Sequence, residues 1–151
     1  MTTIAELMTR DPVTVSPSHS VQRAAQLMDE LNVGVLPVCR DGKLVGIVTD
    51  RDITVRAIAA GLIPMNTAVD LVMSEGVRHC HLDQSPAEVL QQMASVQIRR
   101  LPVLDEQQNL VGIVSLGDIA AHSVGGLVDG VDEALRRIST PSAPDRVTAA
   151  A

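Results

Sequence analysis

The chain has 151 residues, a net charge of −6 and 46% hydrophobic residues, yet it contains no Phe, Tyr or Trp. This length is typical of one domain with a substantial core, which must be built from Val, Leu, Ile, Met and Ala. The acidic balance and the lack of aromatic rings argue against nucleic acid or an anionic membrane as a partner, because these ligands are bound by basic patches and by stacking.

Targeting signals are not evident in the sequence. The first residues lack the charged and apolar regions of a signal peptide, and no apolar run approaches the roughly 18 residues of a membrane span. We therefore expect a cytoplasmic protein with no membrane association. Cys39 and Cys80 fit a reducing compartment, in which unpaired cysteines are usually small buried hydrophobes.

The first part of the chain predicts a helix–strand–helix–hairpin–helix order. A short helix ends near Met8, residues 13–15 form a short strand, and Ser20 opens a helix with an apolar face. Two β-branched runs, residues 33–38 and 44–48, flank an Asp-Gly turn and predict a hairpin. A helix over residues 50–60 follows and ends at Gly61. The apolar face of the second helix carries Val21, Ala24, Met28 and Leu31.

The second part of the chain repeats this order. Met8 and Met73, like Pro37 and Pro102, are 65 residues apart (73−8, 102−37), and Gly46 and Gly112, like Asp52 and Asp118, are 66 apart (112−46, 118−52). A duplication of this period predicts two similar units, residues 1–62 and 63–124, that pack about a pseudo-two-fold axis. The cleft between the units is then the first place to expect a ligand.

The second unit has its own start and stop signals. Residues 78–82 are the expected strand, Ser85-Pro86-Ala87-Glu88 is a capping box, and a hairpin with a longer turn precedes a helix over residues 117–124, which ends at Gly125-Gly126. Residues 125–138 then predict an amphipathic helix, and residues 139–151 a disordered tail. The apolar faces of these helices carry Val89, Met93 and Val96, and Leu127, Val131, Leu135 and Ile138.

The most chemically suggestive residues stand where a strand passes into a helix in each unit. Thr49 precedes Asp52 and Ser115 precedes Asp118 by three residues. A helix N-terminus attracts phosphate, the hydroxyl adds a hydrogen bond, and a carboxylate suits the two hydroxyls of a ribose. Arg51 could bind phosphate through its guanidinium. The same residues also fit ordinary capping boxes, and recurrence does not remove that interpretation.

Metal binding and catalysis have weaker support. His79 and His81 alternate in a strand and point to one face, with Cys39 as a conceivable third ligand, but a structural zinc site needs about four ligands. We therefore predict no metal site and keep His79 and His81 as weak candidates. Nucleophile elbows and phosphate-binding Gly-Lys loops are absent from the sequence, so we expect no enzyme activity.

The order of these motifs, with Leu-Pro-Val before each hairpin and Gly-Ile-Val-[Thr/Ser]-x-x-Asp after it, resembles the CBS domain, in two tandem copies over about residues 1–124. The chain is similar to small stand-alone bacterial CBS proteins, the hypoxic response proteins among them. The resemblance implies an α+β fold with a β-α-β-β-α order in each copy. It also implies up to two clefts for AMP, ADP or ATP, and a homodimer formed through helices.

The resemblance also assigns candidate site residues. Thr49 and Asp52 would hold phosphate and ribose in one cleft, and Ser115 and Asp118 would do so in the other. Asp50 and Arg51 have no charged counterparts in the second unit, so unequal occupancy is our hypothesis. The other positions implied at the nucleotide, which border the base or supply charge, are Thr14, Val35, Pro37, Cys80, Ile98, Arg100 and Pro102.

The sequence therefore predicts a regulatory module that senses adenine nucleotides, with no other cofactor. Such a module would report to an unidentified protein partner or through its last helix. Two alternatives remain open, namely a structural or stress-response dimer that binds no nucleotide and a metal-binding CBS protein.

Overall fold

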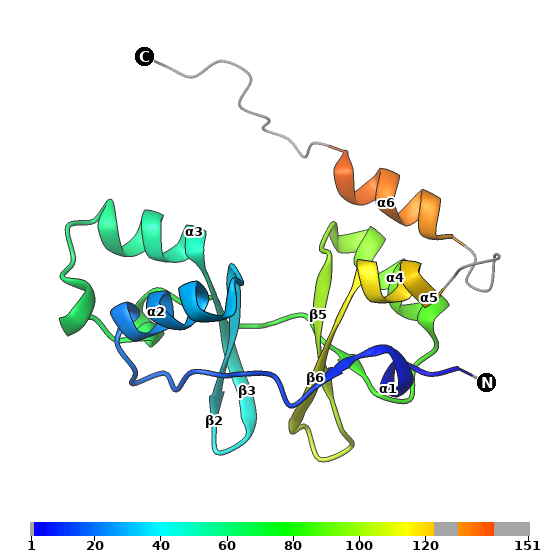
Figure 1. The fold of residues 1–151 in the computed structure, drawn as a ribbon, viewed down its shortest axis with the longest axis horizontal. Coiled ribbons are helices and arrows are strands. Elements are labelled where there is room, and N and C mark those ends of the chain that lie inside the picture. The colour runs from blue at the N-terminus through cyan, green and yellow to red at the C-terminus, as the bar shows by residue number, and fades with distance from the viewer. Residues whose placement is uncertain (1, 123–129, 141–151) are drawn as a thin grey trace.

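The computed structural model describes residues 2–122 and 130–140, which form two lobes joined by crossing segments (Figure 1). The first lobe contains one hairpin, β2 (Val35–Arg40) and β3 (Lys43–Thr49), and the helix α2 (Val21–Leu31). After β3 come the three-residue helix α3 (Asp50–Asp52) and the π-helical turn η1 (Ile53–Ile58). The 3₁₀ turns η2 (Pro64–Asn66) and η3 (Val69–Leu71) follow them.

The second lobe holds a four-stranded sheet in the order β1-β6-β5-β4. Its strands are β1 (Thr9–Arg10), β4 (Cys80–His81), β5 (Arg100–Leu104) and β6 (Leu110–Ser115). The helices α1 (Ile4–Leu7), α4 (Pro86–Val96), α5 (Leu116–His122) and α6 (Val131–Ser139) complete this lobe. The sheet is mixed, since β4 runs parallel to β5 and the other pairs are antiparallel. Within the described residues, none of the helices has the length and apolar character to span a membrane.

The predicted tandem α+β architecture is confirmed, but three details of the first unit differ. The strand expected over residues 13–15 is a single parallel bridge from Val15 to Val38, because Pro12 and Pro17 confine the pairing. The helix expected over residues 50–60 is α-helical only in α3, and it continues as the π-helical η1, which ends at Ile58. Leu31, expected on the buried face of α2, is 42% exposed because it turns toward the gap between the lobes.

Some predictions fall on residues that the structure does not describe. Val124 and the Gly125-Gly126 helix end lie outside the described residues, as does Leu127. The tail expected to be disordered lies outside them from residue 141 onward. The amphipathic helix expected over residues 125–138 is α6, which begins only at Val131, because the preceding Gly130 has a left-handed φ of 92°. Its Ala134 is buried, and Val131 and Ile138 pack against the same core, but Leu135, expected on that apolar face, is 47% exposed.

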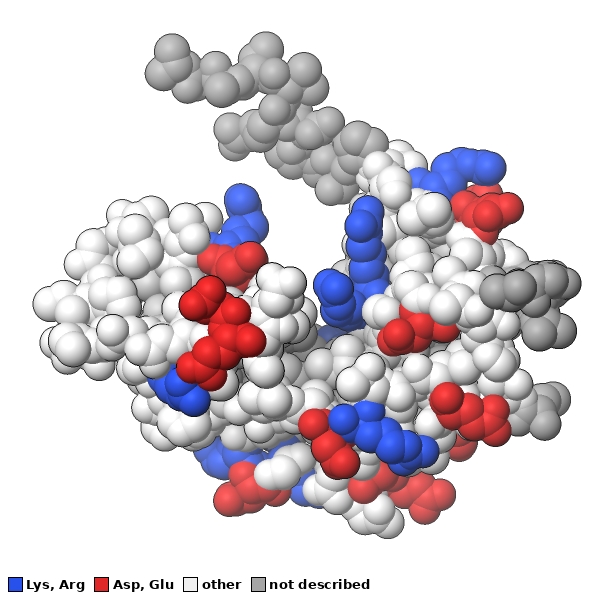
Figure 2. Space-filling model, viewed as in Figure 1, with Lys and Arg blue, Asp and Glu red and all other residues white. Residues whose placement is uncertain are grey.

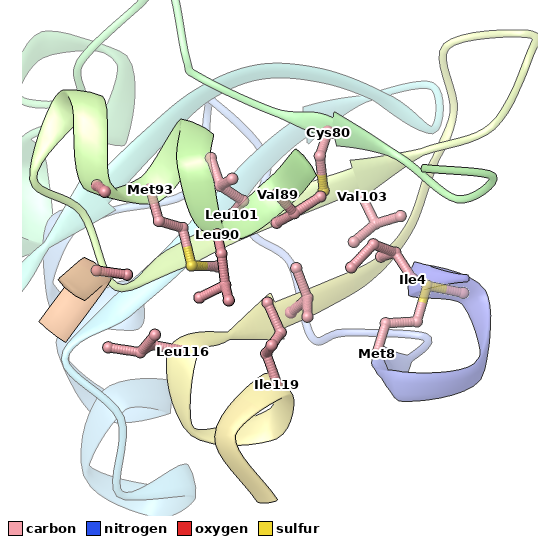
Figure 3. Close-up of a cluster of buried hydrophobic side chains, with 13 residues drawn as sticks. Ile4, Met8, Cys80, Val89, Leu90, Met93, Leu101, Val103, Leu116 and Ile119 are labelled. Carbon is pink, nitrogen blue, oxygen red and sulfur yellow. The ribbon is translucent and has the colours of Figure 1, made fainter. Parts of the chain in front are cut away.

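Each lobe receives the opening turn of the other half of the chain. Ile4 and Met8 of the N-terminal segment belong to the buried cluster of the second lobe, where Figure 3 shows them beside Val103. The reverse holds for Val69 and Val72, which pack into the first lobe. Backbone bonds support the exchange, since the Ile4 and Ala5 amides donate to Gln84 and Leu82 oxygens at 2.9 and 3.0 Å. The cores are therefore interlocked.

This exchange explains why both halves of the chain carry the same methionine and the same glycine. Met8 lies against Gly112, and Met73 lies against Gly46. A Cβ atom on Gly112 would overlap the Met8 sulfur and lie 2.9 Å from the Thr9 carbonyl oxygen. On Gly46 it would lie 2.5 Å from the Met73 sulfur and 3.0 Å from the Ser74 oxygen. Only glycine allows the crossing segment to lie against the hairpin, so these repeated glycines serve the packing between the lobes.

Candidate functional site

A cavity of about 380 Å³ lies between the two lobes. The segment after α1 forms one side, the end of α2 and the start of β2 form a second, and β5 and β6 contribute one residue each. The lining residues are Thr9, Pro12, Val13, Leu31, Asn32, Val33, Gly34, Val35, Leu36, Pro37, Arg100 and Ile113. Pockets of about 300–1,000 Å³ are the usual size for small-molecule sites.

The Ser115–Asp118 motif adjoins this cavity. Ile113 lines the cavity, and Ser115 lies two residues further along β6, so both side chains point to the same face of the sheet. We call the cavity together with Ser115 and Asp118 the serine cleft. By the symmetry of the repeat, Thr49 and Asp52 take the equivalent place beside the other crossing segment, where Ile47 pairs with Ser74 as Ile113 pairs with Thr9. We call that position the threonine side.

Both motifs form capping boxes. The Asp118 carboxylate accepts from the Ser115 amide at 2.8 Å, and the Ser115 hydroxyl accepts from the Asp118 amide at 3.0 Å. The matching distances for Thr49 and Asp52 are 2.9 and 3.0 Å. The second oxygen of Asp52 lies 3.8 Å from the guanidinium of Arg56. Each motif is therefore held rigid by its own helix start, with one oxygen of each aspartate used in the cap.

The two sides differ in charge at the position that precedes β2 and β5. Gly34 borders the serine cleft, and the Asp50 amide donates to its carbonyl oxygen at 2.9 Å. On the threonine side Arg99 takes the place of Gly34, and the Leu116 amide donates to the Arg99 oxygen at 2.7 Å. Figure 2 shows basic side chains on both walls of the hollow between the lobes, with acidic ones beside them on the first lobe.

The structure brings some predicted site residues together and leaves others apart. Val35, Pro37 and Arg100 line the cavity, and Ser115, three residues before Asp118, pairs with Arg100 across β5 and β6. Thr14 is exposed beside the lining residue Val13, and Arg51 is exposed at the start of α3. Ile98 is half-buried against the core of the second lobe, and Pro102 is buried.

Cys80 does not face the cleft. It is 1% exposed within the core of the second lobe, and its thiol lies 3.7 Å from the Pro102 oxygen. Burial raises the pKa of the Cys80 thiol to about 12, and burial also raises the pKa of Cys39. Cys80 pairs with Val103 in the sheet, and its side chain belongs to the buried cluster that residues of α1 and α4 complete.

The sequence did not predict the other nine lining residues, which are Thr9, Pro12, Val13, Leu31, Asn32, Val33, Gly34, Leu36 and Ile113. One signal was available, since Asn32 follows the apolar face of α2 at a position where Asn tolerates the left-handed backbone that it adopts, with a φ of 54°. The exposure of Leu31 carries no sequence signal, because the helical period places it with buried neighbours.

The histidine pair lies away from the cavity. The rings of His79 and His81 are 5.4 Å apart, while Cys39 is on β2 of the other lobe. Among residues 2–122 and 130–140, no group of three or more metal-binding side chains is close enough to hold an ion.

Comparison with known proteins identifies the repeat. The family model for the CBS domain matches residues 4–57 and again residues 68–125. The chain is 42% identical to the CBS domain-containing protein YhcV of Bacillus subtilis over 139 residues, which covers 92% of this chain and 96% of YhcV.

Two solved structures resemble the fold. Hypoxic Response Protein I with two coordinated zinc ions shares 37% identity at a TM-score of 0.73, covering 80% of this chain and 98% of that one. CBSX2 in complex with AMP shares 26% identity at a TM-score of 0.72, covering 83% of this chain and 98% of that one. These matches confirm the resemblance drawn from the motifs.

Proposed function

The chain belongs to the CBS-domain family as a tandem pair, and we propose that it is a regulatory module that binds AMP, ADP or ATP in the serine cleft. The observation that carries this proposal is the cavity between the lobes, whose lining combines aliphatic side chains with Arg100, the strand partner of Ser115. The AMP complex of CBSX2, a structural neighbour, supports an adenine nucleotide as the ligand class.

The lining suits the three parts of a nucleotide. Val35, Pro37 and Ile113 offer aliphatic contacts to both faces of a base, which must replace stacking in a chain without aromatic residues. The cap uses one carboxylate oxygen of Asp118, so the other oxygen can accept a hydrogen bond from a ribose hydroxyl. The Ser115 hydroxyl can donate a hydrogen bond to the nucleotide. Arg100, which is exposed at the cavity, suits a phosphate.

The threonine side is the weaker site in this proposal. Ile98 and Arg99 stand where Val33 and Gly34 border the serine cleft, so the larger side chains occupy more of the space available to a base. Thr49, Arg51 and Asp52 would then add phosphate and ribose contacts at lower affinity. Unequal occupancy of the two sides follows from this difference in size and charge.

Ligand binding in the serine cleft would act as a signal because the cavity is built from both lobes. A nucleotide that contacts Val35 of the first lobe and Arg100 of the second stabilises the lobe arrangement in which both contacts form. No turnover of the ligand is part of this role. The readout is the change in the arrangement that another protein, or another part of this chain, can recognise.

A second copy of the chain is the partner that the surface supports best. Apart from Leu135 on α6, the large hydrophobic side chains that are exposed in the described residues gather in two places. Val13, Leu31 and Val33 line the cavity, and six others lie within residues 55–71 on the outer face of the first lobe. We propose that this second face, Val55, Ile58, Leu62, Ile63, Met65 and Leu71, is buried in a homodimer.

Calorimetric titration with AMP, ADP and ATP tests the nucleotide proposal. Wild type should bind at least one nucleotide at about micromolar affinity, near −8 kcal/mol. Asp118→Ala should weaken that binding more than Asp52→Ala, which removes the equivalent cap on the threonine side and serves as the matched control. Absence of heat with all three nucleotides at millimolar concentration would return both aspartates to helix capping alone.

A further inference from the structure

Helix α6 lies beyond the two CBS matches and packs on the outside of the second lobe (Figure 1). Its Ala134 is buried against α4, whose facing side presents Ala87, Leu90 and Ala94. The corresponding positions of α2, 65 residues earlier, are Gln22, Ala25 and Asp29. Of these two described helices, α4 alone offers an apolar face that suits a covering helix.

The docking of α6 is loose for a core contact. A cavity of about 240 Å³ remains between α4 and α6, and Leu135 is 47% exposed. A helix of nine residues has little stability of its own, so α6 depends on docking to stay helical. Small changes in its contacts should therefore change how often it is docked.

Gln97 fastens the C-terminal end of α6. Its side-chain amide donates to the carbonyl oxygens of Arg137 and Thr140, each at 2.9 Å. Gln97 itself ends α4 in a left-handed conformation, with a φ of 55°. Its counterpart Asn32 ends α2 in the same way but lines the ligand cavity. One repeated position thus serves the cavity in the first lobe and α6 in the second.

The residues after Gln97 lead directly to the serine cleft. The carbonyl of Arg99 accepts from the amide of Leu116, which lies inside the Ser115–Asp118 motif, at 2.7 Å. Arg100 lines the cavity. Arg100 follows Gln97 by three residues, and the bond between Arg99 and Leu116 ties the same segment to the Ser115–Asp118 motif. The contact of Gln97 with α6 is therefore joined to both groups that would hold a nucleotide.

We propose that α6 is the output element of the module and that Gln97 couples its docking to the occupancy of the serine cleft. This inference rests on the proposed function. A nucleotide would bind Arg100 through its phosphate and Asp118 through its ribose. These two contacts would hold residues 98–100 in place against the start of α5. Gln97 is then held where its amide reaches α6, so binding favours the docked helix.

Hydrogen exchange of the α6 amides with and without AMP tests this coupling, with calorimetry on the same samples. Bound AMP should slow exchange over residues 134–139 by about fivefold, the lower end of common coupling strengths. Gln97→Asn keeps a residue that tolerates the left-handed conformation but is too short to reach α6. This variant should bind AMP normally and lose the response of α6. Gln26→Asn, an equal change on the exposed surface of α2, should keep it.

The outcomes separate the two proposals. Heat of binding without a change in α6 exchange overturns the coupling and leaves the nucleotide site in place. The same holds if Gln97→Asn responds as wild type does. Absence of heat with AMP, ADP and ATP overturns the nucleotide site and the coupling with it. Protection of α6 in wild type and in Gln26→Asn, but not in Gln97→Asn, is the result that supports the inference.

Discussion

Gly112→Ala should destabilise the protein because the crossing N-terminal segment leaves no room for a Cβ atom. The added carbon would overlap the Met8 sulfur and lie 2.9 Å from the Thr9 carbonyl oxygen. The methionine side chain is flexible and can move away, but the Thr9 oxygen belongs to the backbone that pairs β1 with β6. The strand pair must therefore separate by several tenths of an ångström.

Overpacking of this kind costs about 1–3 kcal/mol in the free energy of unfolding. For a chain of this size, that corresponds to a fall of about 2–12 °C in the melting temperature. Differential scanning calorimetry measures both quantities. Gly112→Ala combined with Met8→Ala removes the sulfur clash but not the backbone clash, so the double variant should stay less stable than wild type.

Gly117→Ala is the matched control, since the nearest atom to its added Cβ would be the Ser115 hydroxyl oxygen at an ordinary 3.5 Å. Gly117 lies in helix α5, where alanine is preferred over glycine by up to about 1 kcal/mol. This variant should match or exceed the stability of wild type. A Gly112→Ala variant as stable as Gly117→Ala would refute the interlocked packing of the two lobes.

Three further outcomes follow from the structure. Burial raises the pKa of Cys80 to about 12, so above about pH 9 the unfolded chain loses a proton that the folded chain keeps. The free energy of unfolding should therefore fall as pH rises from 9 toward 12, and Cys80→Ala should flatten that slope in denaturant titrations. Asp118→Ala removes a helix cap and should cost about 1 kcal/mol in the same titrations without ligand, and an unchanged midpoint would show the cap to be dispensable. Met65→Asp should shift the chain from dimer to monomer in light scattering, while Asn66→Asp should not, and a persistent dimer would place the interface elsewhere.

Local signals in the sequence predicted local structure well. Ser85 and Glu88 form the expected reciprocal capping box, and the hairpin between β2 and β3 turns at Asp41 and Gly42, both with positive φ. The second hairpin has no such dipeptide. There the Asp105 carboxylate accepts from the Gln107 and Asn109 amides, both at 2.9 Å. Backbone bonds such as that from Asn109 also lower the pKa of Asp105.

Contacts between distant segments were not accessible in the same way. The helical period placed Leu31 on the buried face of α2, but the cavity between the lobes left it exposed. The pairing of Met8 with Gly112 was visible only as recurrence, and its meaning depends on which lobe receives the N-terminal turn. The site followed the same division, since Ser115 and Asp118 were found as a motif while Ile113 and Asn32 required the fold.

The most direct test of the nucleotide site is methyl NMR with AMP, ADP or ATP on a chain labelled at Val, Leu and Ile. The chain has no Phe, Tyr or Trp, so its four histidines are the only source of ring-current shifts in the free protein. A bound adenine ring would therefore introduce a new ring current at the cavity. Methyl resonances of Val35 and Ile113, which line the cavity, should shift strongly, while those of the core residue Ile119 should not. Unchanged Val35 and Ile113 resonances at saturating nucleotide would contradict a base seated in the serine cleft.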